Sequence, residues 1–338
     1  MVFVQLDSIN EIDCRGQEVN PDISGIGVRV SFYLQNVFLL FLVNRSWEDA
    51  PGALWTFTMT NIGLTVAAIV QTANQQLSLF QALQVSNLVW LANFGCFFAL
   101  ASYSRRRDTK KKVRDGLSEN HVPTTSHTPN LNWVNSIPRY ASMLQMLFSM
   151  ALTLYTWANA SSFGNQDACA PFVKYVVFFA TLPALGSGRV VALTVTSFLT
   201  AVYVALSLHE LLAQYCSYRR GTRHSDLHFS RAELEPGYIA YLSIHKSKGT
   251  RLAVDPMLVG ILICQAVVFV YFIICTELLL QRNPSIYSSS DNEWGFGQIL
   301  ALIVIVPSLI SLIQAFQKHG LGSLHHLKSR PRRRHSTA

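Results

Sequence analysis

The most constraining feature of this sequence is a long stretch without charge. Residues 50–104 contain no Asp, Glu, Lys or Arg. About 20 apolar residues cross the hydrocarbon core of a bilayer, so this stretch is too long for one crossing and suits two. The polar run at residues 71–76 places the turn between the two crossings. A basic cluster at residues 105–112 ends the stretch, and because basic residues beside a span favour the cytoplasmic side, it predicts the orientation of the chain.

Composition supports an integral membrane protein. The sequence is 50% hydrophobic and 14% charged, and the charges are excluded from long blocks, which is unusual for a soluble domain. The net charge is +8, but the basic residues lie in loops beside apolar segments, where membrane topology accounts for them. No basic stretch carries the interleaved aromatic residues typical of RNA binding, so we expect a lipid bilayer as partner and no nucleic acid.

Seven segments are predicted as transmembrane helices. Their predicted bounds are 25–43, 54–72, 83–103, 140–160, 190–209, 256–276 and 294–316. Residues 1–24 carry five acidic side chains against one Arg and show no cleavable signal peptide, so we place them outside as an extracellular tail. The loops 104–138 and 215–255 and the tail 317–338 are basic and are placed in the cytoplasm. We therefore predict an all-α polytopic bundle with seven spans, its N-terminus outside and its C-terminus cytoplasmic.

The segment 172–185 leaves an alternative open. It is apolar but short, it is interrupted by Lys174, and it ends at Pro183 and the Gly-Ser-Gly run 186–188. If it crossed the membrane, the chain would have eight spans and the basic tail would face outside. We expect an extracellular or interfacial hairpin here instead, and we expect Trp157, just before this region, to be an interface aromatic residue.

Three kinds of modification are suggested by residues near the predicted membrane surfaces. Cys14 and Cys169 both fall outside, where an oxidising compartment lets them form a disulfide; the alternative is two free thiols. Asn159 begins an Asn-Ala-Ser triplet at the outer end of the fourth span and is a candidate N-glycosylation acceptor. Ser336 follows two arginines in the tail, and its phosphorylation would weaken contact between that tail and anionic lipid.

Polar side chains inside the predicted spans are the candidate functional residues. Amides in a bilayer commonly pair across helices, and the sharper interpretation is that they line a ligand site or a pore. These amides are Gln35, Asn36, Asn61, Asn87, Asn93, Gln145, Gln265 and Gln298. Two charges lie near the outer ends of spans, Arg29 in the first and Glu277 in the sixth. We expect Arg29 to form an ion pair with Glu277 or Glu293, the alternative being simple solvation.

Two glycine-containing motifs lead into the first and the last span. Residues 20–29 read NPDISGIGVR and residues 292–299 read NEWGFGQI. These motifs and the order of the spans resemble a family of uncharacterised fungal multi-pass membrane proteins, and the resemblance implies no known activity, ligand or catalytic residue. Glycines allow helices to approach closely, and Asp22 and Glu293 favour helix N-termini. We therefore predict that spans one and seven pack together at these motifs; the alternative is that each motif only begins its own helix.

The sequence contains no catalytic constellation that we can identify. His209 and Glu210 begin like the HExxH zinc motif, but Ala213 stands where the second His is needed. There is no Gly-rich phosphate loop, no GxSxG elbow and no CxxC pair. We therefore expect no enzyme activity, no cofactor and no metal. The seven-span topology resembles that of G-protein-coupled receptors, but residues 306–310 read VPSLI where that family has NPxxY.

The predicted function is accordingly broad. We expect a receptor-like or sensory membrane protein of unknown ligand in the plasma membrane or a membrane of the secretory pathway. One alternative is a small-solute transporter or channel that uses the amides inside the spans. Another is a scaffold that recruits partners through its basic cytoplasmic loops. The basic loops and tail also predict contact with anionic lipid.

Overall fold

The described part of the chain is a bundle of long helices. A computed structural model describes residues 20–46, 50–117, 137–163, 169–224, 256–284 and 294–319. The long helices are α3 (Ile26–Arg45), α4 (Ala50–Ala73), α5 (Leu79–Leu117), α7 (Ile137–Ala158), α8 (Arg189–His224), α10 (Pro256–Gln281) and α11 (Phe296–His319). The one-turn helix α2 (Pro21–Ser24) precedes α3.

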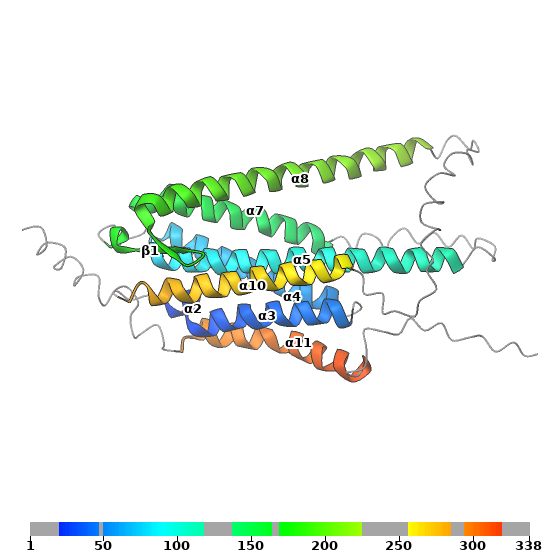
Figure 1. Cartoon of the computed structure of the whole chain (residues 1–338), viewed down its shortest axis with the longest axis horizontal. Coiled ribbons are helices and arrows are strands. Elements are labelled where there is room, and N and C mark those ends of the chain that lie inside the picture. Colours follow the sequence, from blue (N-terminus) through cyan, green and yellow to red (C-terminus); the bar gives the residue numbers. More distant parts are fainter. Residues whose placement is uncertain are drawn as a thin grey trace, which may run out of the picture.

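Consecutive long helices run in opposite directions, so the bundle has two distinct ends (Figure 1). At one end lie α2, the start of α11 and the segment between α7 and α8, and we call it the hairpin end. At the other end the C-terminal parts of α5 and α8 project beyond the neighbouring helices, and we call it the basic end because these parts contain residues 105–112 and 219–223. The short connections after α3 and after α4 account for the first two of these reversals.

Six of the described helices are long and apolar enough to cross a membrane. The corresponding segments are Pro21–Asn44, Ala50–Ala73, Leu79–Ser102, Ala184–His209, Val259–Gln281 and Phe296–Gln317. Helix α7, the predicted fourth span, is not in this set, although it packs beside α4, α5 and α8. Its mean hydropathy is lowered by polar residues at helical spacing, among them Gln145, Ser149 and Thr153, which are buried inside the bundle.

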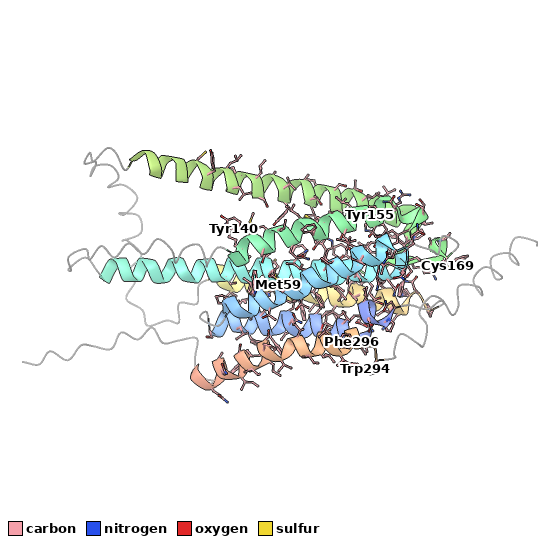
Figure 2. All side chains as sticks on the ribbon, turned by 180° about the vertical axis from the view of Figure 1, so that it is seen from behind. Met59, Tyr140, Tyr155, Cys169, Trp294 and Phe296 are labelled. Carbon is pink, nitrogen blue, oxygen red and sulfur yellow. The ribbon has the colours of Figure 1, made fainter. Side chains whose placement is uncertain are left out.

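Apolar side chains cover the outside of the bundle as well as its interior. Met59, Tyr140 and Tyr155 all point outward and are 40% or more exposed (Figure 2). Trp294 and Phe296 are exposed together where α11 begins, at the hairpin end. A soluble protein rarely exposes continuous apolar surface of this extent, whereas a membrane bundle turns it toward lipid. The exposed surface therefore agrees with a multi-pass membrane protein.

The helices differ greatly in how deeply they are buried. In α5, 72% of an apolar stretch of 18 residues within Leu79–Ser102 is buried, because α5 contacts α3, α4, α7 and α10. In the Ala184–His209 segment, which comprises η3 and most of the apolar part of α8, only 11% of an apolar stretch of 18 residues is buried, and the main helical neighbour of α8 is α7. Helix α5 is thus the central element of the bundle, and α8 lies at its edge.

The segment between α7 and α8 forms a small hairpin. Strands β1 (Lys174–Val177) and β2 (Ala180–Pro183) pair antiparallel, with Lys174 opposite Pro183 and Val177 opposite Ala180. Three short helical turns flank the strands: η1 (Ala160–Ser162), η2 (Ala170–Phe172) and η3 (Ala184–Gly188). Asn283 joins the hairpin to the end of α10, because its side chain accepts from Lys174 N at 2.7 Å and donates to Lys174 O at 2.9 Å. The segment 172–185 therefore forms a hairpin in this structure rather than a spanning helix.

Two predicted loops begin differently from expectation. The loop predicted at 104–138 begins inside α5, which continues to Leu117, and the loop predicted at 215–255 begins inside α8, which continues to His224. Lys and Arg are good helix formers, so a basic sequence directly after a span can prolong its helix. The residues at 118–136 and 225–255 lie outside the described part.

Candidate ligand pocket

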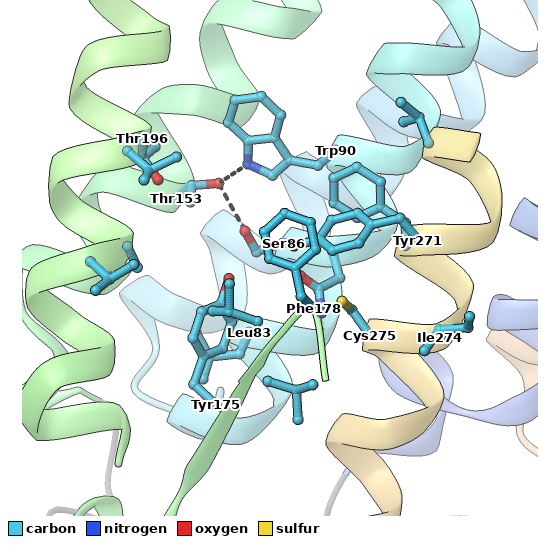
Figure 3. Close-up of a pocket in the computed structure, with 18 of the residues that line it drawn as sticks. Leu83, Ser86, Trp90, Thr153, Tyr175, Phe178, Thr196, Tyr271, Ile274 and Cys275 are labelled. Carbon is cyan, nitrogen blue, oxygen red and sulfur yellow. Dashed lines mark hydrogen bonds between the residues drawn. The ribbon is translucent and has the colours of Figure 1, made fainter. Parts of the chain in front are cut away.

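A cavity of about 630 Å³ lies between α5, α7, α8, α10 and the β1–β2 hairpin (Figure 3). Helix α5 contributes its first turns, α7 its last turns and α10 its C-terminal half. Its volume is typical of sites that enclose a small organic molecule. Its principal polar lining residues are Ser86, Asn87, Thr153 and Thr196, and most of the rest are apolar or aromatic.

The inner wall of the pocket carries a closed hydrogen-bond network. Trp90 Nε1 donates to Thr153 Oγ1 at 3.0 Å, and Ser86 Oγ lies 2.9 Å from the same oxygen. Thr153 uses its single hydroxyl proton to bond Ser149 O at 2.8 Å, so it accepts from both Trp90 and Ser86. These hydrogen bonds connect α5 to α7 behind the cavity, and the polar groups involved serve as hydrogen-bond partners for one another.

The outer rim of the pocket is apolar and exposed. Phe178 and Phe179 at the hairpin turn, Val195 on α8, and Val267 and Val270 on α10 are all more than half exposed. Figure 3 looks between α8 and α10 toward the buried residues on α5. Because these rim side chains lie on the outside of the bundle, the pocket opens sideways, toward the region that lipid occupies in a membrane.

The described lining residues of the pocket include no Asp, Glu, Lys, Arg or His. Tyr175 stands in edge-to-face contact with Trp157, with ring centroids 4.7 Å apart. Burial raises the pKa of Tyr175 to about 12, so its phenol stays neutral. An uncharged, mainly apolar ligand matches such a lining, because a charged one would lose its hydration without gaining a counter-charge.

The structure corrects one expectation at this site. Trp157 is buried and lines the pocket, so its indole does not face lipid or water as an aromatic anchor at the membrane interface would. The hairpin folds back over the end of α7 and covers the indole, and Arg189 Nε holds the adjoining backbone by donating to Trp157 O at 3.0 Å. This return of the chain is a tertiary contact that the spacing of aromatic residues does not reveal.

Three of the predicted amides bond to one another away from the pocket. Asn61 Nδ2 on α4 donates to Asn93 Oδ1 on α5 at 2.8 Å. Gln145 Nε2 on α7 lies 2.7 Å from Thr65 Oγ1 and 3.2 Å from Asn61 O. These bonds tie α4, α5 and α7 together in the interior, which matches the interpretation that in-span amides hold the bundle. Gln265 is buried on α10 and does not line the pocket.

The two glycine motifs meet where α3 and α11 begin. Gly27 N on α3 donates to Gln298 Oε1 on α11 at 2.9 Å, and Gly297 N on α11 donates to Asp22 Oδ1 at 2.9 Å. Each helix N-terminus is thus capped by a side chain that belongs to the other motif. The prediction that spans one and seven pack here agrees with this geometry, but Asp22 caps α11 rather than only its own short helix.

Arg29 and Glu277 are brought together near the hairpin end. Arg29 Nη1 lies 2.7 Å from Glu277 Oε2, and Tyr33 Oη donates to Glu277 Oε1 at 3.0 Å. The Arg29 side chain is 7% exposed, whereas that of Glu277 is 41% exposed. Glu293, the other predicted partner, lies outside the described residues.

The remaining predicted sites have different outcomes. Cys169 is buried and disulfide-bonded, while Cys14 lies outside the described residues, so the pairing of these two stays a prediction. Asn159 is partly exposed after the last turn of α7, and its side chain donates to Tyr155 O at 3.0 Å. Ser336 lies outside the described residues. Within the described part no three His, Cys, Asp or Glu side chains are grouped as metal ligands.

Most pocket residues were not predicted as a site. The sequence gives no reason to distinguish several of them from other apolar residues of spans and loops, among them Trp90, Phe178, Val195 and Tyr271. Asn87 is the exception, because an amide inside a predicted span is the one sequence feature that indicates a pocket residue here. The pocket itself depends on how far α8 lies from α10, and no sequence pattern encodes that separation.

A scan against protein-family models finds no match, and comparisons with curated proteins and with solved structures find none either. The resemblance to uncharacterised fungal membrane proteins therefore stays a prediction. The class of the protein rests on its helices: six described helices of membrane-spanning length and apolarity identify a multi-pass membrane protein.

Proposed function

We propose that the protein is a receptor-like or sensory membrane protein that binds an apolar molecule in the pocket between α5, α7, α8 and α10. The observation that carries this proposal is the pocket itself, with its buried inner wall on α5 and α7 and its apolar opening toward lipid. In the proposed topology α7 completes seven spans, the N-terminus lies outside and the basic end faces the cytoplasm. The protein then acts by binding, without catalysis.

The position of the pocket suggests how occupancy would reach the basic end. Helices α5 and α8 both line the pocket near the hairpin end, and both continue past the bundle at the basic end. Helix α8 is held mainly by α7 and η3, so a ligand between α8 and α10 changes a substantial share of its contacts. A ligand that favours one position of α8 shifts the population toward that position.

The transporter alternative has less support. It depended on in-span amides lining a path, but Asn61, Asn93 and Gln145 bond to one another in the interior. The scaffold alternative retains one supporting observation, since α5 and α8 carry basic segments away from the bundle, where partners or anionic lipid can contact them. It differs from the receptor proposal in requiring no occupied pocket.

The test compares hydrogen exchange of the basic end with the pocket open and filled. Purified protein in lipid nanodiscs is measured with and without dehydroergosterol, an uncharged apolar probe, and exchange is followed over residues 104–117 and 210–224. We expect the probe to change exchange in wild type but not in Ala192→Phe, which fills the pocket from α8. The control is Ala205→Phe, an exposed position on the same helix outside the pocket.

The receptor proposal fails if the probe binds and exchange at the basic end does not change. It also fails if Ala192→Phe responds in the same way as Ala205→Phe, because the response then does not come from the pocket.

A further inference from the structure

One polar group that lines the pocket has no partner. Asn87 lies on α5 next to Ser86, and its side chain is buried, with 7% exposure. Its Nδ2 atom makes no hydrogen bond within the described part of the chain. Its neighbours Ser86, Trp90 and Thr153 are all satisfied by one another. Asn87 is therefore the polar lining residue with an unused buried donor.

An unused buried donor is costly, so an acceptor that enters the pocket gains more from it than an acceptor in water would. The acceptor has to be uncharged, because the described lining offers no cation to balance an anion. It has to be attached to an apolar body, because most of the lining is aliphatic or aromatic. These conditions describe a lipid-like molecule with a single oxygen head.

We propose that Asn87 Nδ2 donates a hydrogen bond to the hydroxyl oxygen of an uncharged lipid alcohol whose apolar body fills the pocket. This inference rests on the proposed ligand pocket and specifies its ligand class. The membrane supplies such a molecule from the side, through the apolar rim formed by Val195, Val267 and Phe178. The head then lies against α5 and the body between α8 and α10.

Two sources of this chemistry fit the cavity, a ring-based sterol and a straight-chain fatty alcohol. Dehydroergosterol represents the first and cis-parinaryl alcohol the second. Both absorb tryptophan emission, and Trp90 and Trp157 line the pocket as donors for energy transfer. The charged comparison is cis-parinaric acid, which has the same chain and a carboxylate head.

The affinity of each probe is measured by energy transfer in detergent micelles. Only the part of the energy-transfer signal that is lost in the pocket-filling variants Ala192→Phe and Val195→Phe is counted as binding in the pocket. The test variant is Asn87→Leu, which keeps the size of the side chain and removes the donor. The matched control is Gln35→Leu, since Gln35 is also a buried amide with no partner among the described residues but does not line the pocket. Both variants remove an unsatisfied amide, so neither is expected to lower thermal stability.

We expect Asn87→Leu to weaken binding of at least one alcohol about five- to tenfold, the effect of one lost hydrogen bond, and Gln35→Leu to leave it unchanged. The alcohol that shows this loss identifies the source. We expect cis-parinaric acid to bind more weakly than the alcohol.

The outcomes separate this inference from the proposed pocket. If Asn87→Leu binds both alcohols like wild type while Ala192→Phe does not bind them, the pocket stands and the role of Asn87 is wrong. Equal affinity for the acid and the alcohol also overturns the ligand class. If the pocket-filling variants change nothing, both the pocket and the inference fail.

Discussion

The contact between Asp22 and Gly297 provides the sharpest test of how the first and last spans are joined. A Cβ atom added at Gly297 would lie 2.8 Å from Asp22 Cβ and 2.9 Å from Asp22 O. Neither neighbour is the flexible end of a side chain, so α11 has to move away from α2. That movement also lengthens the 2.9 Å hydrogen bond from Gly297 N to Asp22 Oδ1.

The expected cost of Gly297→Ala follows from three contributions. Overpacking a tight contact costs about 1–3 kcal/mol. Weakening the hydrogen bond to a carboxylate adds up to about 1.5 kcal/mol. The better helix propensity of Ala returns up to about 1 kcal/mol, less in the first turn where Gly297 lies. The net prediction is a destabilisation of about 1–3 kcal/mol.

The matched control is Gly63→Ala in α4. Gly63 is exposed within the helix, and a Cβ there would have no neighbour within 4 Å. Its substitution keeps only the gain in helix propensity, up to about 1 kcal/mol. Thermal unfolding of both variants in the same detergent, followed by tryptophan fluorescence, should lower the midpoint for Gly297→Ala and not for Gly63→Ala. If Gly297→Ala melts at or above wild type, α2 and α11 do not pack as described.

Two further predictions concern polar contacts, and a third concerns a disulfide. Glu277→Ala should lower the free energy of unfolding by roughly 2–3 kcal/mol, because it leaves the buried Arg29 guanidinium without its counter-charge. Arg29→Met should cost less, because the remaining Glu277 carboxylate still accepts from Tyr33 and is partly exposed to solvent. Equal losses of stability for the two variants in thermal unfolding would contradict this prediction. Asn93→Leu should cost about 0.6–1.7 kcal/mol by removing the interhelical bond to Asn61, and a double-mutant cycle showing no coupling between them would refute the assignment. Cys14→Ser and Cys169→Ser should produce the same shift on a non-reducing gel, and a shift in only one variant would exclude their pairing.

The sequence by itself determined where the long helices begin and that most of them suit a bilayer, although it did not predict that α5 and α8 continue as helices beyond their spans. The absence of charge from residues 50–104 is sufficient to predict membrane spans there, because a charged side chain inside a span is costly. The exclusion of charge over such a length is visible without any structure. The motifs at residues 20–29 and 292–299 likewise indicated a close approach, since glycine removes the side chain that would prevent it. Asn61, Asn93 and Asn87 were recognised as candidates because amides are rare in spans.

Only the tertiary structure decided what these residues contact. Asp22 caps α11 and Gln298 accepts from α3 because the two helices start side by side, a relation between residues more than 270 positions apart. Asn61 Nδ2 and Asn93 Oδ1 bond to each other, whereas the Asn87 side chain has no hydrogen-bond partner among the described residues, although all three are amides in predicted spans. The difference is one of position: Asn87 lies on the part of α5 that faces the space between α8 and α10. Long-range packing, which leaves no periodic trace in a sequence, therefore decides whether an amide joins helices or faces a pocket.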